Sequence, residues 1–429
     1  MKIYENAAAA AGILKRGGFD DPARAETVRA IVADVRRNGD RALFSYCEKF
    51  DGAALTAETV AVSPAEFEAA YKAVDATLLA SLRRAVKNVY EYHARAPKKD
   101  DVRTVNGRTT GYVVRAVERA GIYVPGGTAP LVSSVLMGVL PAKAAGVEHI
   151  FVCTPAKEGK VAPAILVAAA ECGAEKVFKV GGAQAIAALA YGTESIPKVD
   201  VIAGPGNIFV TLAKKEVYGD VGIDMLAGPS EILIVADNRQ NPDYIAADVL
   251  SQAEHDRLSR AIVLTDDKAF AERVCARVEA RLADLPRREI AAASLEQGGG
   301  VILVKDMEEA ADLANAIAPE HLELATENCE ELLKKIRSAG AVFLGGYTPE
   351  PVGDYFAGPD HVLPTGGSAR FFEVLNQDIF LRKMSVIRYT PEALAEDGAD
   401  IVRLAESEQL IAHSNAIRAR KNEKKGESL

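Results

Sequence analysis

The chain has 429 residues, of which 49% are hydrophobic and 26% charged, and its formal net charge is −9. This length predicts two to four domains, and the acidic balance, with basic residues scattered among acidic ones, argues against a nucleic-acid partner. No apolar run approaches the roughly 20 residues that a membrane span requires, and the five cysteines without a Cys-x-x-Cys pair indicate a reducing compartment, so we expect a cytoplasmic protein with no membrane partner.

The first part of the chain is expected to be helical. Residues 1–20 predict a short N-terminal helical arm, because their apolar stretch is too short and too soon interrupted for a targeting signal. Residues 19–100 also predict helices, since apolar residues such as Val28, Ile31 and Val35 recur at a spacing that places them on one helix face. Neither segment indicates catalytic chemistry.

From Gly121 onward, short β-branched runs alternate with alanine-rich helical stretches. The runs expected to form strands cover residues 121–125, 149–153, 176–180 and 199–203, followed by a second series at 231–236, 261–265, 301–304 and 341–344. Helices are expected at about 161–172, 183–192 and 207–217. Strands that alternate with helices in this way are typical of βαβ units and a parallel sheet.

These patterns predict an α/β fold with two doubly wound, Rossmann-like parallel-sheet domains and small helical N- and C-terminal arms. The expected parts are an N-terminal helical arm over 1–20, a discontinuous first α/β domain over 21–122 and 231–378, a second α/β domain over 123–230, and a C-terminal helical arm over 379–429.

Three glycine loops follow expected strands of the second α/β domain, at Pro125–Pro130, Gly181–Ala185 and Gly204–Asn207. Open parallel sheets bind ligands at the carboxyl ends of their strands, where glycine lets the backbone come close and helix N-termini offer N–H groups to an anion. No stretch of the sequence fits the G-x-G-x-x-G dinucleotide fingerprint. A structural role as strand-to-helix turns therefore stays open beside a cofactor-binding role.

Four polar residues are candidates for a metal site. Gln252 and His255 are three residues apart in a stretch, residues 246–255, that predicts a helix, so both side chains share one face. Asp354 is expected in a loop, and His413 near the end of a C-terminal helix. Two imidazoles, a carboxylate and an amide oxygen suit Zn²⁺ in a catalytic or substrate-holding site. The alternative, that each is a helix-surface or capping residue, stays open.

A second constellation pairs a carboxylate with an imidazole. Glu320 and His321 are adjacent in an otherwise apolar run, where burial raises the pKa of a glutamate and favours neutral histidine, as a general base requires. Neighbouring residues of an extended segment point to opposite faces, so the two share a pocket only if the backbone turns there. His361, in a later loop, could reach the same place, whereas His93 and His149 are expected to be surface or packing residues.

Seven short motifs occur in a fixed order along the chain. They are Tyr-Val-Pro-Gly-Gly at 123–127, Val-Gly-Gly-Ala-Gln-Ala at 180–185, Gly-Pro-Gly-Asn at 204–207, Ala-Gly-Pro-Ser-Glu at 227–231, Ser-Gln-Ala-Glu-His at 251–255, Ala-Pro-Glu-His-Leu-Glu at 318–323 and Gly-Pro-Asp-His-Val-Leu-Pro-Thr-Gly-Gly at 358–367. In this order the chain closely resembles the histidinol dehydrogenase family, from about residue 24 to residue 420. The whole set is far more specific than any one motif.

The resemblance implies a role for each candidate residue. Zinc ligands are implied at Gln252, His255, Asp354 and His413, and catalytic roles at Glu320 and His321. NAD contacts are implied at Tyr123, Gln184 and Asn207. Substrate contacts are implied at Ser230, His361 and Glu408 together with the six zinc-binding and catalytic residues.

The implied activity is the NAD-dependent, four-electron oxidation of L-histidinol through L-histidinaldehyde to L-histidine, which ends histidine biosynthesis. Zinc would hold the substrate by its imidazole and amine nitrogens. His321 would be the general base for both oxidations, and Glu320 would activate the water that adds to the aldehyde. The family pattern is an intertwined homodimer, in which the C-terminal arm, carrying Glu408 and His413, completes the partner's active site.

Three other functions fit parts of the sequence. They are a dehydrogenase of the same family that acts on another small diol or amino alcohol, a metal-binding protein without catalysis, and a nucleotide-binding module. Ser230, His361 and Glu408 favour the imidazole substrate over another alcohol. Glu320 and His321 argue against a chain that has lost catalysis.

One residue departs from the family pattern. Asp360 precedes His361 where the resemblance leads us to expect Asn. The added negative charge is expected to raise the pKa of His361 and to place a second carboxylate near Asp354. The departure therefore bears on which carboxylate would bind the metal.

Overall fold

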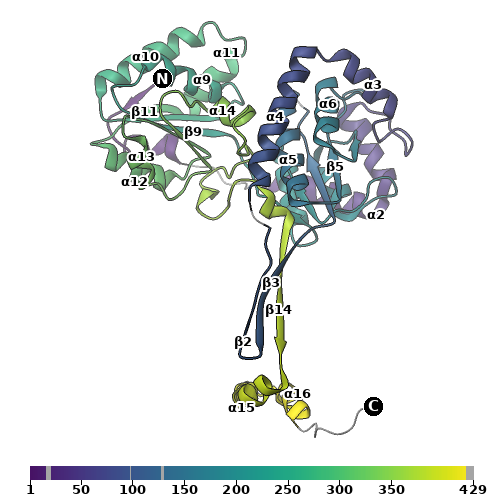
Figure 1. Cartoon of the computed structure of the whole chain (residues 1–429). Coiled ribbons are helices and arrows are strands. Elements are labelled where there is room, and N and C mark those ends of the chain that lie inside the picture. The colour runs from purple at the N-terminus through teal and green to yellow at the C-terminus, as the bar shows by residue number, and fades with distance from the viewer. Residues whose placement is uncertain (16–20, 97, 127–129, 422–429) are drawn as a thin grey trace. The chain divides into compact units, whose positions relative to one another are not determined.

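The computed structural model describes residues 1–15, 21–96, 98–126 and 130–421 (Figure 1). Two compact units are present: Met1–Ala96 with Val117–Phe380, and Pro97–Ala116 with Leu381–Leu429. Among the described residues, none of the helices is both long enough and apolar enough to cross a membrane.

The first unit contains a six-stranded sheet in which every neighbouring pair is parallel. In spatial order its strands are β1 (Ile3–Tyr4), β11 (Gly299–Leu303), β10 (Arg260–Thr265), β9 (Glu231–Ala236), β12 (His321–Ala325) and β13 (Ala341–Leu344). Both faces of the sheet are covered: Ile232 and Ile234 pack in one apolar cluster, and Leu233 and Val235 in another. Because β9 is buried on both faces, it is a continuous apolar run rather than an alternating one.

The helices associated with this sheet follow its strands along the chain. They are α1 (Ala11–Leu14), α9 (Pro242–Ala253), α10 (Lys268–Leu282), α11 (Arg288–Gly298), α12 (Met307–Ile317), α13 (Cys329–Leu333) and α14 (Glu350–Tyr355), with a short 3-10 turn, η1 (Ser368–Arg370). A second 3-10 turn, η2 (Gln377–Phe380), contacts the helix Val132–Ala145 instead. Asn241 caps the start of α9 through its side-chain oxygen, with Pro242 in the first turn.

The same unit contains a five-stranded parallel sheet. In spatial order its strands are β6 (Lys176–Phe178), β5 (His149–Cys153), β4 (Arg119–Tyr123), β7 (Val201–Ala203) and β8 (Gly222–Ile223). The chain winds outward from β4 to β6 and then crosses back to β7 on the other side of β4. This reversal makes the carboxyl ends of β4 and β7 a topological switch point, where α/β sheets bind ligands.

Among the described residues, seven helices surround this second sheet. They are α2 (Pro22–Asp51), α3 (Pro64–Ala73), α4 (Ala76–Ala94), α5 (Val132–Ala145), α6 (Pro163–Cys172), α7 (Gly182–Tyr191) and α8 (Ile208–Val217). Helix α2 packs on α7 and α8, and its Val28, Ile31 and Val35 share one core cluster with Ile186 of α7 and Ile202 of β7.

The second unit is a three-stranded antiparallel sheet followed by two helices. Its elements are β2 (Asp101–Val105), β3 (Arg108–Ala116), β14 (Leu381–Tyr389), α15 (Pro391–Ser407) and α16 (Ile411–Lys421). Arg108 of β3 binds Asp397 of α15 through two hydrogen bonds of 2.7 and 2.6 Å. Large apolar side chains stay exposed on this unit, including Ile387 at 73% and Leu404 at 68%.

The predicted fold class is confirmed, with two doubly wound parallel sheets and helices near both ends. The expected strands 149–153, 231–236 and 341–344 coincide with β5, β9 and β13. The largely apolar character of β5 and β9 is that of strands buried on both faces, whereas β13 is a partly buried edge strand.

The predicted domain limits need correction in three places. The arm over 1–20 is only partly helical, because Ile3 and Tyr4 form β1 and pair with β11. Residues 21–122 do not join residues 231–378 in one lobe, because α2 packs on the five-stranded sheet and β4 is its central strand. The arm over 379–429 begins with a strand, β14, which pairs with β3. The hairpin of β2 and β3 and strand β14 were not predicted, because much of their surface stays exposed and lacks an alternating apolar pattern.

Candidate active site

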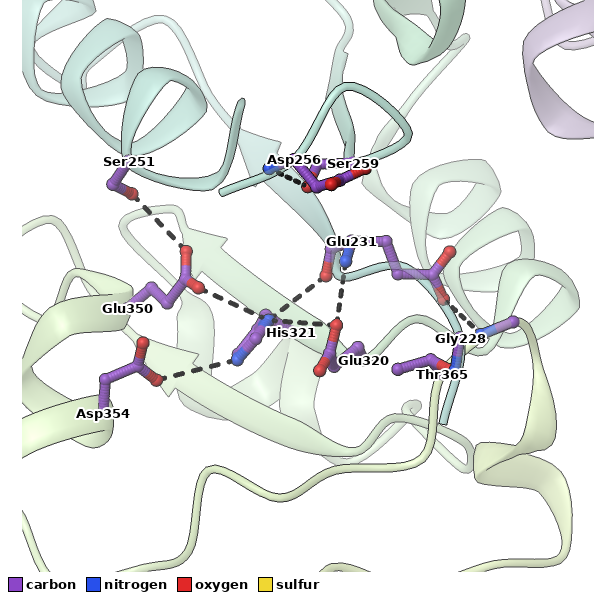
Figure 2. A network of polar contacts seen from close by, with 11 residues as sticks. Gly228, Glu231, Ser251, Asp256, Ser259, Glu320, His321, Glu350, Asp354 and Thr365 are labelled. Carbon is purple, nitrogen blue, oxygen red and sulfur yellow. Dashed lines mark hydrogen bonds and ion pairs between the residues drawn. The ribbon is translucent and has the colours of Figure 1, made fainter. Parts of the chain in front are cut away.

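The candidate catalytic residues lie at the amino ends of two paired strands of the six-stranded sheet. Glu231 is the first residue of β9 and His321 the first of β12, and His321 pairs with Ile232 in the parallel register. The backbone of Glu231 therefore lies beside Glu320 and His321, which both make contact with it (Figure 2). Glu320 precedes the strand, so the alternation of a strand does not separate its side chain from that of His321.

His321 is held in one tautomer. Its Nδ1 lies 3.2 Å from the carbonyl oxygen of Glu231. A carbonyl only accepts, so Nδ1 carries the hydrogen and Nε2 keeps its lone pair. Nε2 is buried without a hydrogen-bond partner and lies 3.8 Å from Oδ1 of Asp354. Burial lowers the pKa of His321, which favours the neutral imidazole, so Nε2 is available as a proton acceptor.

Glu320 is the second candidate catalytic residue. Its Oε2 accepts a 2.8 Å hydrogen bond from the backbone N–H of Glu231 and lies 3.8 Å from Nδ1 of His321. Burial raises the pKa of Glu320 well above its usual range, and the neighbouring carboxylates of Glu231, Glu350 and Asp354 add to the effect. A raised pKa makes the ionised carboxylate a stronger base than an exposed glutamate.

Three of the described side chains form a cluster able to hold a metal ion. Ligand atoms of His255, Glu350 and Asp354 all lie within 4.8 Å of one another. Gln252, one turn before His255, is fully buried, and within the described part of the chain neither its amide oxygen nor its nitrogen has a hydrogen-bond partner. Buried amides normally have hydrogen-bond partners. A buried amide without one, three residues from a member of this cluster, therefore fits the role of a metal ligand.

Two local predictions about these residues need correction. Helix α9 ends at Ala253, so His255 lies in the turn beyond it, where its N–H donates to the carbonyl of Gln252 at 3.3 Å. Asp354 lies within α14 rather than in a loop. Both residues nevertheless belong to the cluster.

Glu350 is the functional candidate that the sequence reading missed. It is only 1% exposed, its Oε1 lies 3.6 Å from Nδ1 of His321, and its Oε2 accepts a 3.4 Å hydrogen bond from Ser251. Burial raises the pKa of Glu350 to about 8, and burial together with the Glu350 charge raises the pKa of Asp354 to about 7. The sequence signal that could have identified Glu350 is its position four residues before Asp354, because residues four apart on a helix share a face.

His361 reaches the same place through the loop that follows α14. It is hydrogen-bonded to the backbone of Asp354, and burial, together with the nearby His321 and His255, lowers its pKa to about 4. The expectation that Asp360 raises this pKa is wrong. The carboxyl of Asp360 is buried, which raises its own pKa well above the usual range and keeps it neutral.

Asp360 faces His93 instead. Its Oδ2 lies 4.0 Å from Nε2 of His93, and both atoms are buried without a hydrogen-bond partner, while Oδ1 accepts a 2.7 Å hydrogen bond from the N–H of Val362. Burial lowers the pKa of His93 to about 4. The expected packing role of His93 is therefore confirmed, and the partly exposed His149 lies 2.6 Å from Glu175.

Asp360→Asn is expected to leave the stability of the protein within about 1 kcal/mol of wild type, because an amide keeps the acceptor for Val362 and offers an N–H toward His93. Asp360→Ala removes the acceptor of the Val362 N–H and leaves a gap beside His93, and it is expected to cost about 1–3 kcal/mol. Urea unfolding of the two variants measures the difference. A variant with Asn that is as unstable as the one with Ala would show that Asp360 is ionised.

The implied NAD contacts lie at the carboxyl edge of the five-stranded sheet. Tyr123 ends β4, and its hydroxyl accepts a 3.1 Å hydrogen bond from the N–H of Gly182. Gln184 is buried in the first turn of α7. Asn207 caps α8, its side-chain oxygen accepting from the N–H groups of Phe209 and Val210. These residues share the switch point of the sheet, whereas residues 127–129 of the first glycine loop lie outside the described residues.

The remaining substrate and metal candidates fall in two places. Ser230 precedes β9 directly and its carbonyl accepts a 3.0 Å hydrogen bond from the N–H of Arg260. Glu408 and His413 belong to the second unit, and both are exposed. The predicted single C-terminal helix around them is wrong, because α15 ends at Ser407 and α16 begins at Ile411.

Comparison with known proteins gives a consistent result. The family model described as histidinol dehydrogenase matches residues 14–421. A histidinol dehydrogenase of Bacillus subtilis is 52% identical over 397 residues, covering 92% of both chains, and one of Carboxydothermus hydrogenoformans is 50% identical over 396 residues, covering 92% of this chain and 93% of that one. The crystal structure of histidinol dehydrogenase from Elizabethkingia anophelis superposes with a TM-score of 0.93 at 39% identity and covers 98% of each chain.

Proposed function

Because the chain belongs to the histidinol dehydrogenase family, we propose that it oxidises L-histidinol through L-histidinaldehyde to L-histidine, with NAD as cofactor and zinc holding the substrate. The observation that carries the proposal is the buried His321, whose unpaired Nε2 faces a cluster of metal-binding side chains. A general base beside a site for a substrate-holding cation is the arrangement that such an oxidation requires.

The donor set fits a zinc ion. Gln252, His255 and Asp354 would hold it, with His413 contributed by a partner subunit, and a bound Zn²⁺ would supply a Lewis acid that fixes the imidazole and amine nitrogens of the substrate. One observation supports this fit: the amide of Gln252 is buried without a hydrogen-bond partner among the described residues.

The proton transfers follow from the contacts of two residues. Nε2 of His321 accepts the proton of the substrate hydroxyl, while the bond from its Nδ1–H to the Glu231 carbonyl keeps that tautomer in place. Glu320 takes a proton from the water that adds to the aldehyde, while the protonated His321 returns its proton to the aldehyde oxygen. The neutral His321 then accepts a hydroxyl proton of the hydrate as the second hydride leaves. NAD⁺, when bound, supplies the hydride acceptor, once for each oxidation.

For the cofactor, we propose Tyr123, Gln184 and Asn207 as contacts. The support is their position at the carboxyl edge of a doubly wound sheet, near the switch point between β4 and β7. Gly204 supports the same placement. Its φ of +115° favours glycine, and a Cβ at this position would lie 2.1 Å from the carbonyl oxygen of Tyr123, so the backbones at the ends of β7 and β4 are in close contact.

We also propose a homodimer in which Glu408 and His413 enter the partner's site. The exposure of both residues and of Ile387 and Leu404 on the second unit supports this proposal, because a second chain would cover that apolar surface. The five cysteines are free thiols, which supports a cytoplasmic location.

The proposal is tested by the ratio of NADH formed to L-histidinol consumed by the purified protein, with and without a chelator. We expect a ratio near two, because one substrate gives up two hydrides. NADH formation should stop when the chelator removes the metal and resume when Zn²⁺ is added. A ratio near one would mean that the aldehyde leaves, and that Glu320 lacks its proposed role. Absence of NADH would favour another small diol or amino alcohol as substrate.

A further inference from the structure

A buried ion pair lies at the edge of the five-stranded sheet that carries the proposed cofactor loops. Lys214 of α8 is 3% exposed and Asp224, which follows β8, is 5% exposed, and Nζ of the lysine contacts Oδ1 of the aspartate. Removing two charges from water is costly, so a buried pair indicates a specific role for its geometry. Neither residue was among the expected site residues.

Both charged groups hold the backbone of a single residue, Gly204. Nζ of Lys214 donates to the carbonyl oxygen of Gly204 at 3.0 Å, and Oδ2 of Asp224 accepts from its N–H at 2.8 Å. Hydrogen bonds in which one partner is ionised are the stronger ones. Because Gly204 also packs directly on the carbonyl of Tyr123, the two side chains fix the backbone at the end of β7 against that of β4.

The ion pair is continuous with the loop that follows Gly204. Asn207 ends this loop and caps α8, and Lys214 lies seven residues later, on the same face of the helix. The pair, the loop and the start of the helix therefore form one hydrogen-bonded group around the proposed contacts Tyr123 and Asn207.

The hydrogen bonds around the ion pair also extend to the segment that precedes β9, next to the proposed catalytic residues. Oδ1 of Asp224 accepts from the N–H of Met225 at 2.6 Å, and Thr211, between Asn207 and Lys214 on α8, donates to the carbonyl of Ala227 at 2.9 Å. The segment held in this way ends at Glu231, whose backbone contacts Glu320 and His321. One set of contacts thus connects the cofactor loop with the base.

We propose that Lys214 and Asp224 are positioning residues, which fix the Gly204–Asn207 loop so that a bound dinucleotide is held at a set place relative to His321. This inference rests on the proposed function and names residues that act through the loop rather than on the substrate. Loss of the pair is therefore expected to weaken binding of the dinucleotide and to leave the contacts of L-histidinol unchanged.

The test uses the variant Lys214→Met/Asp224→Asn, which removes both charges together, because either change alone leaves an unpaired buried charge. Lys143→Met is the matched control: Lys143 also donates to a backbone carbonyl, that of Cys172, at 3.0 Å, but at the amino edge of the same sheet. We expect the double variant to raise the Kd for NADH, measured by calorimetry, and the KM for NAD⁺ at least about tenfold. The KM for L-histidinol should change less than about twofold, and the control should match wild type in all three quantities.

A folded double variant that binds NADH like wild type would overturn the inference. If the double variant does not fold, Lys214→Arg keeps the ion pair but moves the donor away from Gly204, and a Kd for NADH within twofold of wild type would then overturn it. Wild-type protein that fails to bind NADH would overturn the proposed function itself, so the two failures are distinguishable.

Discussion

His321→Asn is expected to lower kcat for L-histidinol oxidation by about 10² to 10⁴, the usual contribution of a positioned general base. The amide side chain occupies similar space but offers no basic nitrogen in place of Nε2, which is the buried, unpaired atom of the imidazole. The zinc content should stay near wild type, because His321 is not among the proposed zinc ligands. Steady-state kinetics together with metal analysis measure these quantities.

The pH dependence of activity distinguishes a role of His321 as general base from a structural role. Activity of the wild type should fall in acid as His321 becomes protonated, and the lowered pKa of the buried imidazole places that fall below the usual range of histidine. The variant should lose this limb of the profile. His149→Asn, a change to the histidine that pairs with Glu175 on the surface, is the matched control. Near-normal turnover of the His321 variant would remove the residue from the mechanism.

Metal-free protein is expected to become less stable as the pH rises from 6.5 to 8.5, by roughly 2–3 kcal/mol at 1.36 kcal/mol per pKa unit. The pKa of Asp354 is raised to about 7 and that of Glu350 to about 8, so the folded chain holds protons in this window that the unfolded chain has released. Their stabilisation is complete below the unfolded pKa values and is lost as the pH rises through the folded ones. The buried histidines act in the opposite direction, but only below about pH 6.5, where unfolded histidine becomes charged.

Denaturant unfolding with a chelator present, at several pH values, measures how the free energy of unfolding changes with pH. Asp354→Asn/Glu350→Gln should make this dependence shallower, because neither replacement titrates, while Glu320 and Asp360, whose pKa values are also raised, are unchanged. Added Zn²⁺ should restore stability most strongly at high pH, where the ligands are ionised and the ion binds the folded chain alone. Stability of the metal-free wild type that rises between pH 6.5 and 8.5 would contradict the expected protonation of the two carboxyls.

The sequence by itself determined the class of fold and indicated the candidate site residues. Strands 149–153 and 231–236 are largely buried on both faces, so their apolar runs predict strands of a parallel sheet. Residue types and motif order likewise indicated Glu320, His321 and the metal candidates, because the chemistry of a side chain belongs to the residue itself. The hairpin of β2 and β3 carried no such pattern, since it lies in the exposed second unit.

Tertiary structure alone decided how these residues act. The tautomer of His321 depends on the Glu231 carbonyl, 90 residues away in the chain, and Glu350 joins the site only because α14 lies beside the end of α9. Asp360 behaves opposite to expectation, because burial against His93 of α4 outweighs its nominal charge. Protonation and tautomer are properties of the surroundings of a group, and those surroundings come from segments that are far apart in sequence.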